Sequence, residues 1–535
     1  MTCDSAHADI EFGGLQLPSC VSSALTFPFT AVNPGTTAYS FLTIAAGNML
    51  RAVGSPQQHA KYLIPMLEGR FFGTMNLSET QAGSSLGDIT TRAILRADGL
   101  YSITGSKMWI SAGEHDLSEN IVHMVLAKVA LPQPDGSHEV LPGVKGISLF
   151  IVPKRRVLDD GSLGASNGVT LAGLNHKMGY RGTTNCVMNF GEGGEECVGE
   201  LLGGVGEGLS TMFLMMNEAR IAIGFGACAL GHAGYVRSLN YARERRQGRP
   251  ATLRDPSSPQ VPIVQHADVR RMLLVQKAYV EGALSLAMFG SLINDLIHDE
   301  TLKDLDENMQ MERRILLEVL TPVIKSWPSE WCLEANKWAI QIHGGYGYTR
   351  DYDVEQIYRD NRLNMIHEGT NGIQSLDLLG RKITAQKGKG LDIIVDEMMC
   401  SVVRTHEMCV LINGKDGETA VAHANALKEA VERLQSTSLA LMGAGNAGNL
   451  DSMLCNSHEY LNMMGTTLIA WRWLEMELAA GVSRGCGDDS KEAFYESKLI
   501  CSRYFFSHEL PKTVHQANLL TSMDNINLEV ADHHF

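Results

Sequence analysis

The spacing of apolar positions divides the chain into stretches of different texture. Before about residue 70, two stretches with helical spacing, 37–53 and 56–66, follow a start that glycine and proline interrupt. A helical pattern this short cannot enclose a large core of its own. We therefore expect residues 1–70 to form a small, partial N-terminal helical domain.

Between residues 71 and 203 the pattern changes to short β-branched and alternating runs with turns between them. Asp98-Gly99, between two such runs, is a hairpin signal. The predicted strands cover residues 72–77, 92–97, 101–107, 121–129, 146–152 and 185–190. They predict a middle domain that is a β-sandwich or barrel, with the Gly/Ser/Asp-rich segments 133–146 and 159–168 as surface loops.

From residue 206 onward helical spacing returns and persists to the end. The predicted helices cover residues 209–245, 264–297, 309–326, 328–343 and 354–363, and then 391–410, 419–440, 460–480 and 491–506. Long helices joined by short loops predict an antiparallel four-helix bundle over 204–383. Residues 384–535 are interpreted as an extra helical domain, so the expected fold class is multidomain α+β with parts 1–70, 71–203, 204–383 and 384–535.

Composition narrows the class of protein. The 535 residues are 44% hydrophobic and 20% charged, which is typical of a soluble globular chain with a sizeable core. A formal net charge of -15 argues against a protein whose main task is to bind nucleic acid. An anionic ligand would have to be held by local Arg and Lys side chains and by helix N-termini.

Cysteine usage and the N-terminus bear on location. The 11 cysteines include no CxxC pair and no Cys/His spacing of a zinc site, so we expect reduced thiols in an intracellular compartment and no metal. The first residues lack the basic start and apolar run of a signal peptide, and no uncharged apolar run of about 18 residues occurs. We expect a soluble protein without a membrane segment, in the cytoplasm or, in a eukaryote, an organelle matrix.

One short stretch carries the strongest candidate chemistry. Glu368 precedes Gly369-Thr370-Asn371-Gly372, between two segments that are predicted to be helical. The glycines allow a sharp bend, and the bend offers backbone N–H groups to an anion. A general base beside an anionic ligand needs this combination, although an ordinary polar loop has the same composition.

Four further segments have both a functional and a structural interpretation. Residues 76–85 run from a strand into a small-residue loop that suits a flat polar ring or a phosphate, or is a surface turn. Trp109 and Ser111 lie two apart on one strand face, which suits an isoalloxazine edge, or Trp109 is a core residue. Residues 245–249 could cap a helix or bind a pyrophosphate, and 341–348 contain more glycine than a C-cap requires.

Residues 443–448 match GxGxxG, the dinucleotide-binding fingerprint. No predicted strand precedes them and no β-α-β unit surrounds them, so we interpret them as a loop between helices.

The order of the motifs is more specific than any one of them. The chain contains NLSETQAGS (76–84), GSKMWIS (105–111), NEAR (217–220), RRQGR (245–249), QIHGGYGY (341–348) and YRD (358–360) before HEGTNGIQ (367–374). From about residue 10 to 383 this series resembles the acyl-CoA dehydrogenase family. The HEGTNGIQ form, the long loops of the β domain and the helical extension look most like the branch that contains 3-methylmercaptopropionyl-CoA dehydrogenase.

The resemblance implies FAD bound between the β domain and the helical bundle. It implies that Ser78 contacts the pyrimidine end of the flavin, that Trp109 shields the ring and that Ser111 binds near N5. The ADP half would be held by Arg245, Gln341, Gly344 and Gly345, in this family partly across a subunit interface. A homodimer or a dimer of dimers is therefore implied. Thr370 would contact an FAD phosphate, Ser84 would lie near the CoA chain, and Gly369 would contact the substrate.

The implied reaction is α,β-desaturation of an acyl-CoA, with an electron-transfer flavoprotein or a similar acceptor. The α-proton must leave as the β-carbon delivers hydride to the flavin, so a base must face the flavin across the substrate. Glu368 is the implied base. The thioester oxygen gains negative charge, which the Glu368 backbone N–H and a flavin ribityl hydroxyl would stabilise.

The chain departs from the family pattern in a few places. About 70 residues precede the β domain, fewer than a complete family N-terminal domain. The resemblance therefore implies an N-terminally short chain: a partial gene product, a fragment, or a variant whose acyl pocket lacks a wall. His367 stands where the family usually has Tyr, and Thr80 and Ser85 stand where Pro and Asp are commoner. Some relatives carry the base on a bundle helix, where this chain offers Glu218; its setting suggests a structural pair with Arg220 instead.

Two alternatives use the same residues. An acyl-CoA oxidase would admit oxygen to the reduced flavin. A flavin-binding, DNA-associated member of the family would perform no dehydrogenation, but the net charge of -15 speaks against it. The identity of the acyl chain and of the electron acceptor is not encoded in these motifs.

Overall fold

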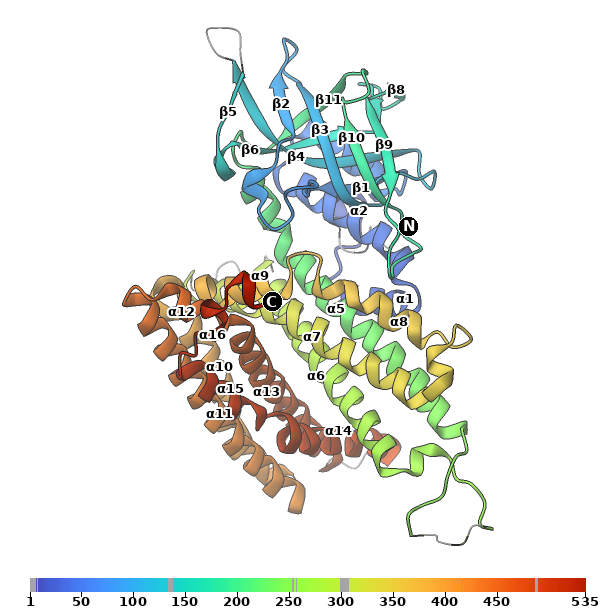
Figure 1. Ribbon diagram of the computed structural model, residues 1–535, viewed down its shortest axis with the longest axis vertical. Helices are drawn as coiled ribbons and strands as arrows, with labels where there is room; N and C mark the ends of the chain where they lie inside the picture. The colour runs from blue at the N-terminus through green and yellow to red at the C-terminus, as the bar shows by residue number, and fades with distance from the viewer. Residues whose placement is uncertain are drawn as a thin grey trace. The chain divides into compact units, whose positions relative to one another are not determined.

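The computed structural model describes residues 6, 8–132, 138–252, 255, 257–298, 307–412, 414–485 and 489–535. The chain forms two compact units, Met1–Ala219 and Arg220–Phe535. The first combines N-terminal helices with a β-sheet domain and the second is helical (Figure 1). The expected multidomain α+β class is confirmed, whereas the four-part division by residue stays a prediction.

The N-terminal helices of the first unit begin at clear local signals. The elements are α1 (Ser19–Val32), α2 (Pro34–Val53), α3 (Pro56–Gln58) and α4 (Ile64–Leu67). The Asn33 side chain caps α2 by accepting from the Thr36 N–H at 3.1 Å, and Pro34 occupies the first turn. Helix α1 was not predicted, because Pro28 lies inside it and disguises the helical spacing.

Helix α2 packs directly on the first strand of the sheet (Figure 1). At the contact, a Cβ added to Gly73 would lie 2.5 Å from Ala46 Cβ, so only glycine permits this approach. The Gly73 N–H donates to Thr43 Oγ1 at 3.1 Å and fixes the helix to the strand.

The first unit contains a nine-stranded sheet and a separate two-stranded sheet of β7 and β8, which together include the predicted strands and several that were missed. The strands are β1 (Phe71–Asn76), β2 (Arg92–Leu95), β3 (Tyr101–Ser111), β4 (Asn120–Pro132), β5 (His138–Val140), β6 (Ile147–Pro153), β7 (Arg155–Val157), β8 (Leu163–Ser166), β9 (Val169–Leu174), β10 (Asn185–Phe190) and β11 (Cys197–Leu202). Hydrogen-bonded neighbours lead from β2 through β4, β6, β11 and β3 back to β2, which closes a barrel. The prediction of a sandwich or barrel is therefore confirmed.

Two predicted surface loops contain strands. Strand β5 lies within 133–146 and pairs with β4, and β8 lies within 159–168 and pairs with β7. The loop prediction was wrong there because both strands are short and exposed, so they have no apolar alternation to reveal them. Residues 133–137 of the first segment lie outside the described residues.

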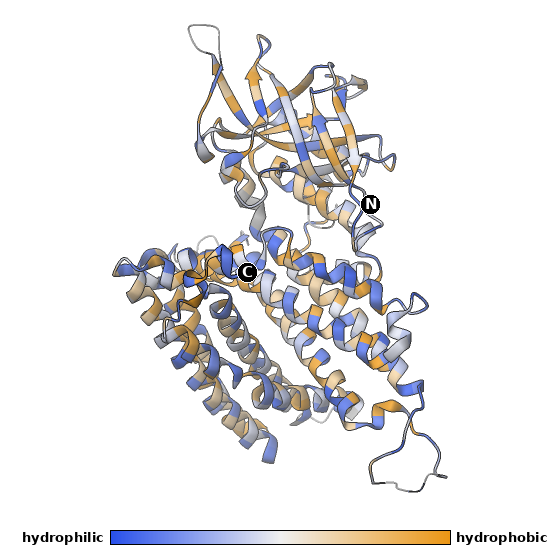
Figure 2. Cartoon of the chain, in the orientation of Figure 1, coloured by the Kyte–Doolittle hydropathy of each residue, from blue (hydrophilic) through white to orange (hydrophobic). Residues whose placement is uncertain are grey.

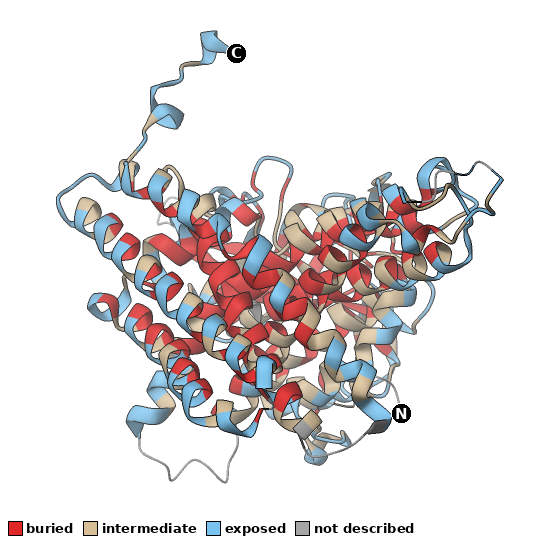
Figure 3. Cartoon of the chain, turned by 90° about the horizontal axis from the view of Figure 1, so that it is seen from below, coloured by how far each residue is buried: buried red, intermediate tan, exposed pale blue. Residues whose placement is uncertain are grey.

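The second unit is built from long helices. They are α5 (Gly208–Glu244, which starts in the first unit), α6 (Ala267–His298), α7 (Glu307–His343), α8 (Val354–Asn361), α9 (Asn371–Asp377), α10 (Lys389–Met408), α11 (Gly414–Asn446), α12 (Leu450–Leu454), α13 (Ser457–Gly485), α14 (Glu492–Tyr504), α15 (Lys512–Thr521) and α16 (Ile526–Glu529). Figure 2 shows apolar and polar residues interleaved along them. Figure 3 shows the buried residues gathered where the helices face one another.

By length and composition alone, α5 and α6 could each cross a membrane. In the structure, 71% and 56% of their most apolar windows are buried, as in core helices of a bundle.

Helix α7 is continuous from Glu307 to His343, so the predicted break between helices 309–326 and 328–343 at Pro328 is wrong. A proline cannot donate to the carbonyl four residues earlier, so Pro328 leaves the Ile324 carbonyl oxygen without its helical partner. That oxygen packs against Gly224 of α5, where an added Cβ would lie only 2.2 Å from it. The close approach of α5 holds the helix continuous through a proline that would end an isolated helix.

Residues 443–448 form the last turn of α11 and the turn after it. Their rejection as a dinucleotide site is consistent with this helical setting, although the helix extends further than the loop we expected.

A buried ion pair organises the β domain next to the 76–85 loop. Lys107 Nζ lies 2.9 Å from Glu79 Oε1, and the two side chains are 0% and 2% exposed. Lys107 Nζ also donates to the Leu77 carbonyl oxygen at 3.0 Å. Glu79 accepts from the Thr90 and Thr91 N–H groups at 2.7 and 3.0 Å. These donors and Lys107 overcome the cost of burial and lower the Glu79 pKa to about 2.

We predict that Lys107→Met lowers the free energy of unfolding of the β domain by about 3–5 kcal/mol, because it leaves a buried carboxylate without its counter-ion. The stabilisation is present above the usual Glu pKa of about 4.3 and is lost as the pH falls toward 2. Urea-dependent hydrogen exchange of residues 71–111 measures it. Lys128→Met is the matched control: Lys128 Nζ donates to the Gly87 carbonyl oxygen at 2.7 Å, and its loss should cost about 1 kcal/mol. Equal losses in the two variants would contradict the prediction.

Candidate active site

The turn that carries Glu368 has an unusual backbone. Glu368 has a φ of +53° and Gly369 a φ of +84°. A side chain at position 369 would place its Cβ 2.5 Å from Gln374 Nε2, so glycine is required there. Gln374 Nε2 donates to the Glu368 carbonyl oxygen at 3.0 Å and holds the turn. A non-glycine residue in the left-handed region is costly, and such residues concentrate at functional sites.

Thr370 ends the turn and starts α9. Its Oγ1 accepts from the Ile373 N–H at 3.2 Å, which makes it the N-cap. The turn therefore leads straight into a helix N-terminus, a favourable place for an anion.

Buried charges surround the half-buried Glu368. Arg220 of α5 is 4% exposed and Lys325 of α7 is 0% exposed. Burial raises the pKa of the Glu368 carboxyl, while the positive charges of Arg220 and Lys325 lower it. Arg220 NH1 in turn lies 3.2 Å from Asp377 Oδ2 of α9. The base candidate thus lies in an environment that tunes its ionisation.

This arrangement corrects the expected pairing of Glu218 with Arg220. Glu218 accepts from Asn48 Nδ2 at 2.8 Å in the first unit, whereas Arg220 pairs with Asp377. The sequence neighbours face different ways because two residues on a helix are about 200° apart.

His367 lies at the end of a buried chain of amides. Its Nε2 donates to Asn364 Oδ1 at 3.0 Å, and Asn364 Nδ2 donates to Asn361 Oδ1 at 2.9 Å. Asn361 Nδ2 donates to Asn336 Oδ1 of α7 at 2.6 Å. Burial and the Lys325 charge lower the His367 pKa to about 3, so the ring is neutral beside the base.

The segment expected to bind the ADP half lies where α5 and α7 end. The Arg245 guanidinium is 5.8 Å from the centre of the Tyr346 ring, just after α5. Gln341 is exposed in the last turn of α7, and Gly344 has a φ of +61° that ends the helix. A Cβ at Gly344 or Gly345 would meet nothing within 4 Å, so both face open space.

In the first unit the structure brings Ser78 to the strand that carries Trp109. The Met108 N–H donates to the Ser78 carbonyl oxygen at 3.0 Å. Strand β3 has one extra residue between Lys107 and Ile110, and Trp109 has a φ of +67° in this bulge. The bulge leaves Trp109 59% exposed while Ile110 is buried. Ser111 Oγ accepts from Asn185 Nδ2 at 3.2 Å, and Ser84 lies on an exposed loop.

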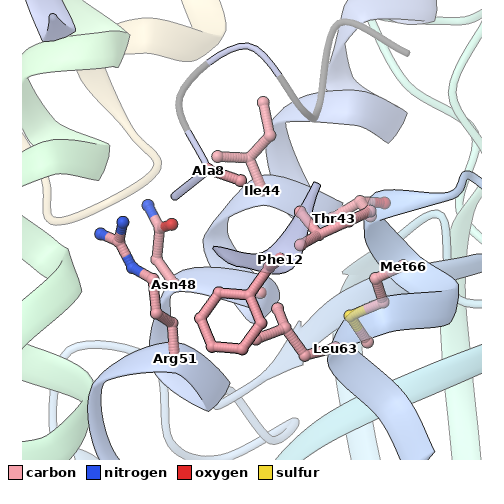
Figure 4. A pocket seen from close by; sticks show the side chains of 10 residues that line it. Ala8, Phe12, Thr43, Ile44, Asn48, Arg51, Leu63 and Met66 are labelled. Atoms are coloured by element: carbon pink, nitrogen blue, oxygen red, sulfur yellow. The ribbon is translucent and has the colours of Figure 1, made fainter. Parts of the chain in front are cut away.

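A small cavity near the N-terminus is not a substrate pocket. It is lined by side chains of α2 and α4 and by Ala8 and Phe12, with Asn48 and Arg51 at one side (Figure 4). Its volume of about 10 Å³ has room for one water molecule and not for an acyl chain.

Comparison with known proteins agrees with the motif order. Residues 74–192, 206–383 and 403–530 match the family models "Acyl-CoA dehydrogenase, middle domain", "Acyl-CoA dehydrogenase, C-terminal domain" and "Acetyl-CoA dehydrogenase C-terminal like". The 3-methylmercaptopropionyl-CoA dehydrogenase of Ruegeria pomeroyi is 34% identical over 92% of this chain and 79% of its own length. The chain belongs to the acyl-CoA dehydrogenase family.

Two other acyl-CoA dehydrogenases show the same relation. A broad-specificity linear acyl-CoA dehydrogenase of Mycobacterium tuberculosis is 31% identical over 98% of this chain and 84% of its own. The crystal structure of an acyl-CoA dehydrogenase with FAD from Bacillus anthracis has a TM-score of 0.74 at 20% identity and covers 98% of this chain and 82% of its own. The predicted family, fold, enzyme class and FAD cofactor are confirmed.

The residues of this acyl-CoA dehydrogenase fit FAD on their own evidence. The exposed Trp109 ring on a fixed bulge offers a flat apolar face, and the open backbone at Gly344 and Gly345 lets a phosphate or ribose approach. Gln374 Oε1 is buried and has no hydrogen-bond partner among the described residues. A bound molecule with a hydrogen-bond donor beside the Glu368 turn would satisfy it.

Sequence reasoning missed Lys325, and it gave no role to Asn371 and Gln374, although both belong to the motif that carries Glu368. Lys325 carried a usable signal, because it is a single charge in the apolar run Thr321–Trp327 of a predicted core helix.

We predict that His367 stays neutral across the working range of the enzyme. Since its pKa is lowered to about 3, its ring nitrogen signals in ¹⁵N-histidine spectra should not titrate between pH 5 and pH 9. The unfolded ring binds a proton below about pH 6.5 and the folded one resists it, so this residue makes stability fall as the pH drops from about 6.5 toward 3. Loss of one signal in His367→Gln identifies the resonance. A midpoint above pH 5 would refute the prediction.

Proposed function

We propose that this acyl-CoA dehydrogenase removes the α-proton of a short-chain acyl-CoA with Glu368 as the base. The observation that carries the proposal is the Glu368 turn itself. A half-buried carboxylate sits there in a left-handed conformation, held by Gln374 and flanked by two buried cations. A structural carboxylate gains nothing from this strain, whereas a base needs one fixed direction.

In the proposed reaction Glu368 accepts the α-proton of the thioester. When bound, FAD supplies the acceptor for the β-hydride. The raised pKa of the Glu368 carboxyl brings it closer to that of the activated α-carbon, and closure of the site by the acyl chain raises it further. The Glu368 backbone N–H would stabilise the negative charge on the thioester oxygen, with Gly369 against the substrate and Ser84 near the CoA chain.

The proposed cofactor contacts form two groups of residues. Ser78, Trp109 and Ser111 would bind the flavin ring system. Arg245, Gln341, Gly344 and Gly345 would bind the ADP half, and Thr370 a phosphate. The family shares this second group across a subunit interface, so we propose a homodimer or a dimer of dimers, with an electron-transfer flavoprotein as the acceptor.

The proposed substrate is 3-methylmercaptopropionyl-CoA or a similar short-chain thioester. The support is the relative that bears this substrate in its name, at 34% identity. Relatives named as a broad-specificity linear acyl-CoA dehydrogenase and as a butyryl-CoA dehydrogenase, at 31% and 32% identity, make linear acyl-CoAs of different lengths, here butyryl- and octanoyl-CoA, the competitors to compare.

We predict that Glu368→Gln lowers kcat by about 10²–10⁴-fold, the usual contribution of a general base. Because Gln is isosteric, the variant should keep the absorbance of bound FAD while losing acyl-CoA-dependent flavin bleaching in an anaerobic cuvette. Turnover at the wild-type rate would rule out Glu368 as the base.

The matched control is Glu218→Gln, the other position at which the family places a base. Its carboxylate accepts from Asn48, so the substitution should affect bleaching little. Loss of bleaching in Glu218→Gln together with its retention in Glu368→Gln would transfer the role to α5.

We predict that, when turnover is measured with a panel of acyl-CoAs, kcat/KM is highest for 3-methylmercaptopropionyl-CoA or butyryl-CoA. A preference for octanoyl-CoA or longer chains would contradict the proposed substrate class. Peroxide yield, with and without an electron acceptor, separates a dehydrogenase from an oxidase, and salt-dependent binding to duplex DNA would indicate the DNA-associated alternative.

A further inference from the structure

Lys325 is a buried cation that no established role explains. It lies in the middle of α7, its side chain is fully buried, and its Nζ donates to Asn371 Oδ1 at 3.3 Å. Among the described residues, no carboxylate forms an ion pair with it. A buried ammonium is expensive without a nearby negative charge, so the fold must supply one at longer range.

The contact with Asn371 places Lys325 beside the turn of the base. Asn371 is the first residue of α9 and stands three residues after Glu368. The Lys325 ammonium and the Glu368 carboxylate interact electrostatically, and each favours the charged form of the other.

Several other charged groups around this turn have partners of their own. On α5 and α9, Arg220 pairs with Asp377, which also binds Arg381. Lys382, after α9, pairs with Glu318 of α7. Glu330 of α7 accepts from Asn371 Nδ2 at 3.1 Å and lies 3.7 Å from His458 of α13.

His367 is neutral, as its pKa of about 3 implies. The Lys325 ammonium and the Glu368 carboxylate therefore stabilise each other, and the positive charge of Arg220 adds to the effect on the carboxylate.

The pKa of Lys325 reflects its interaction with Glu368. Burial and the neighbouring Arg220 lower the Lys325 pKa to about 7, against the opposing effect of Glu368. Two groups that interact in this way titrate as a pair, so the protonation of one depends on the charge of the other.

We propose that Lys325 is a positioning residue for the base: its buried charge keeps the Glu368 carboxylate ionised and sets the lowest pH at which desaturation proceeds. The inference rests on the proposed role of Glu368. Loss of the charge removes an effect that favours the carboxylate, so Glu368 binds a proton at higher pH and the acid limb of the rate profile moves upward.

The test is the pH dependence of kcat/KM and of single-turnover flavin bleaching in FAD-loaded enzyme. Lys325→Met keeps the length of the side chain, and Lys325→Gln keeps a donor for Asn371. In both we expect the acid limb to rise by about one pH unit, because a neighbouring opposite charge shifts a pKa by about 1–3 units. The rate should fall about tenfold at pH 6 and recover to within about twofold at pH 9. Lys325→Arg keeps the charge and should leave the limb at or below its wild-type position.

The control is Lys277→Met, which removes a partly buried lysine of α6 that pairs with Glu281 at 2.5 Å, away from the turn. Its pH profile should match the wild type. An unmoved acid limb in FAD-loaded Lys325→Met, or a loss of rate that is equal at every pH, would overturn the proposal.

If neither neutral variant folds, a raised acid limb in Lys325→Arg would overturn it as well. The outcome is separable from the proposed function. Activity in Glu368→Gln would contradict both the role of Glu368 as the base and the role of Lys325. An unmoved acid limb in Lys325→Met, together with an inactive Glu368→Gln, would contradict the role of Lys325 alone.

Discussion

The structure of the second unit depends on balancing buried charge along α9. Lys325 of α7 donates to Asn371 at the start of α9, and Arg220 of α5 pairs with Asp377 at its end. An unpaired charge in this setting would be costly, so the two long helices and the short one are held in a single arrangement. The position of the Glu368 turn depends on this arrangement, because the side chain of Gln374 of α9 donates to the Glu368 carbonyl oxygen. The balance therefore constrains the backbone of the turn, and the charges of Arg220 and Lys325 favour the ionised form of the Glu368 carboxyl.

The rigidity behind this balance comes from contacts that tolerate little change. Pro328 leaves the Ile324 carbonyl oxygen to pack on Gly224, which brings α5 and α7 closer than side chains would allow. The amide chain from Asn336 through Asn361 to Asn364 then connects α7 to His367, the residue before Glu368. A network whose members all have partners admits one geometry, so it transmits the packing of α7 to the turn.

The sequence predicted elements where a local pattern exists, and it failed where tertiary contacts decide. The middle strands and the long helices have clear alternation or helical spacing, and their predictions were confirmed. Helix α1, strands β5 and β8 and the unbroken α7 were mispredicted, because prolines or short exposed runs hide them until their neighbours are known. At the site, the order of the motifs identified the Glu368 turn and the FAD-binding family. The roles of Lys325, Asn371 and Gln374 could not be predicted, because they depend on contacts between residues that are 46 and 6 positions apart in the sequence.

The C-terminal extension takes part in the same scaffold. Helix α13 packs against α6, α7 and α9, and its Gly465 lies so close to Trp327 that an added Cβ would be 2.3 Å from the indole. Trp327 lies on α7, two residues after Lys325, and its Nε1 donates to Thr466 Oγ1 of α13 at 3.3 Å. Ser457 Oγ, at the start of α13, lies 3.1 Å from Ser375 Oγ of α9. The extension thus packs on the segment of α7 that carries the fully buried Lys325, and burial keeps water from screening the interaction between the Lys325 and Glu368 charges.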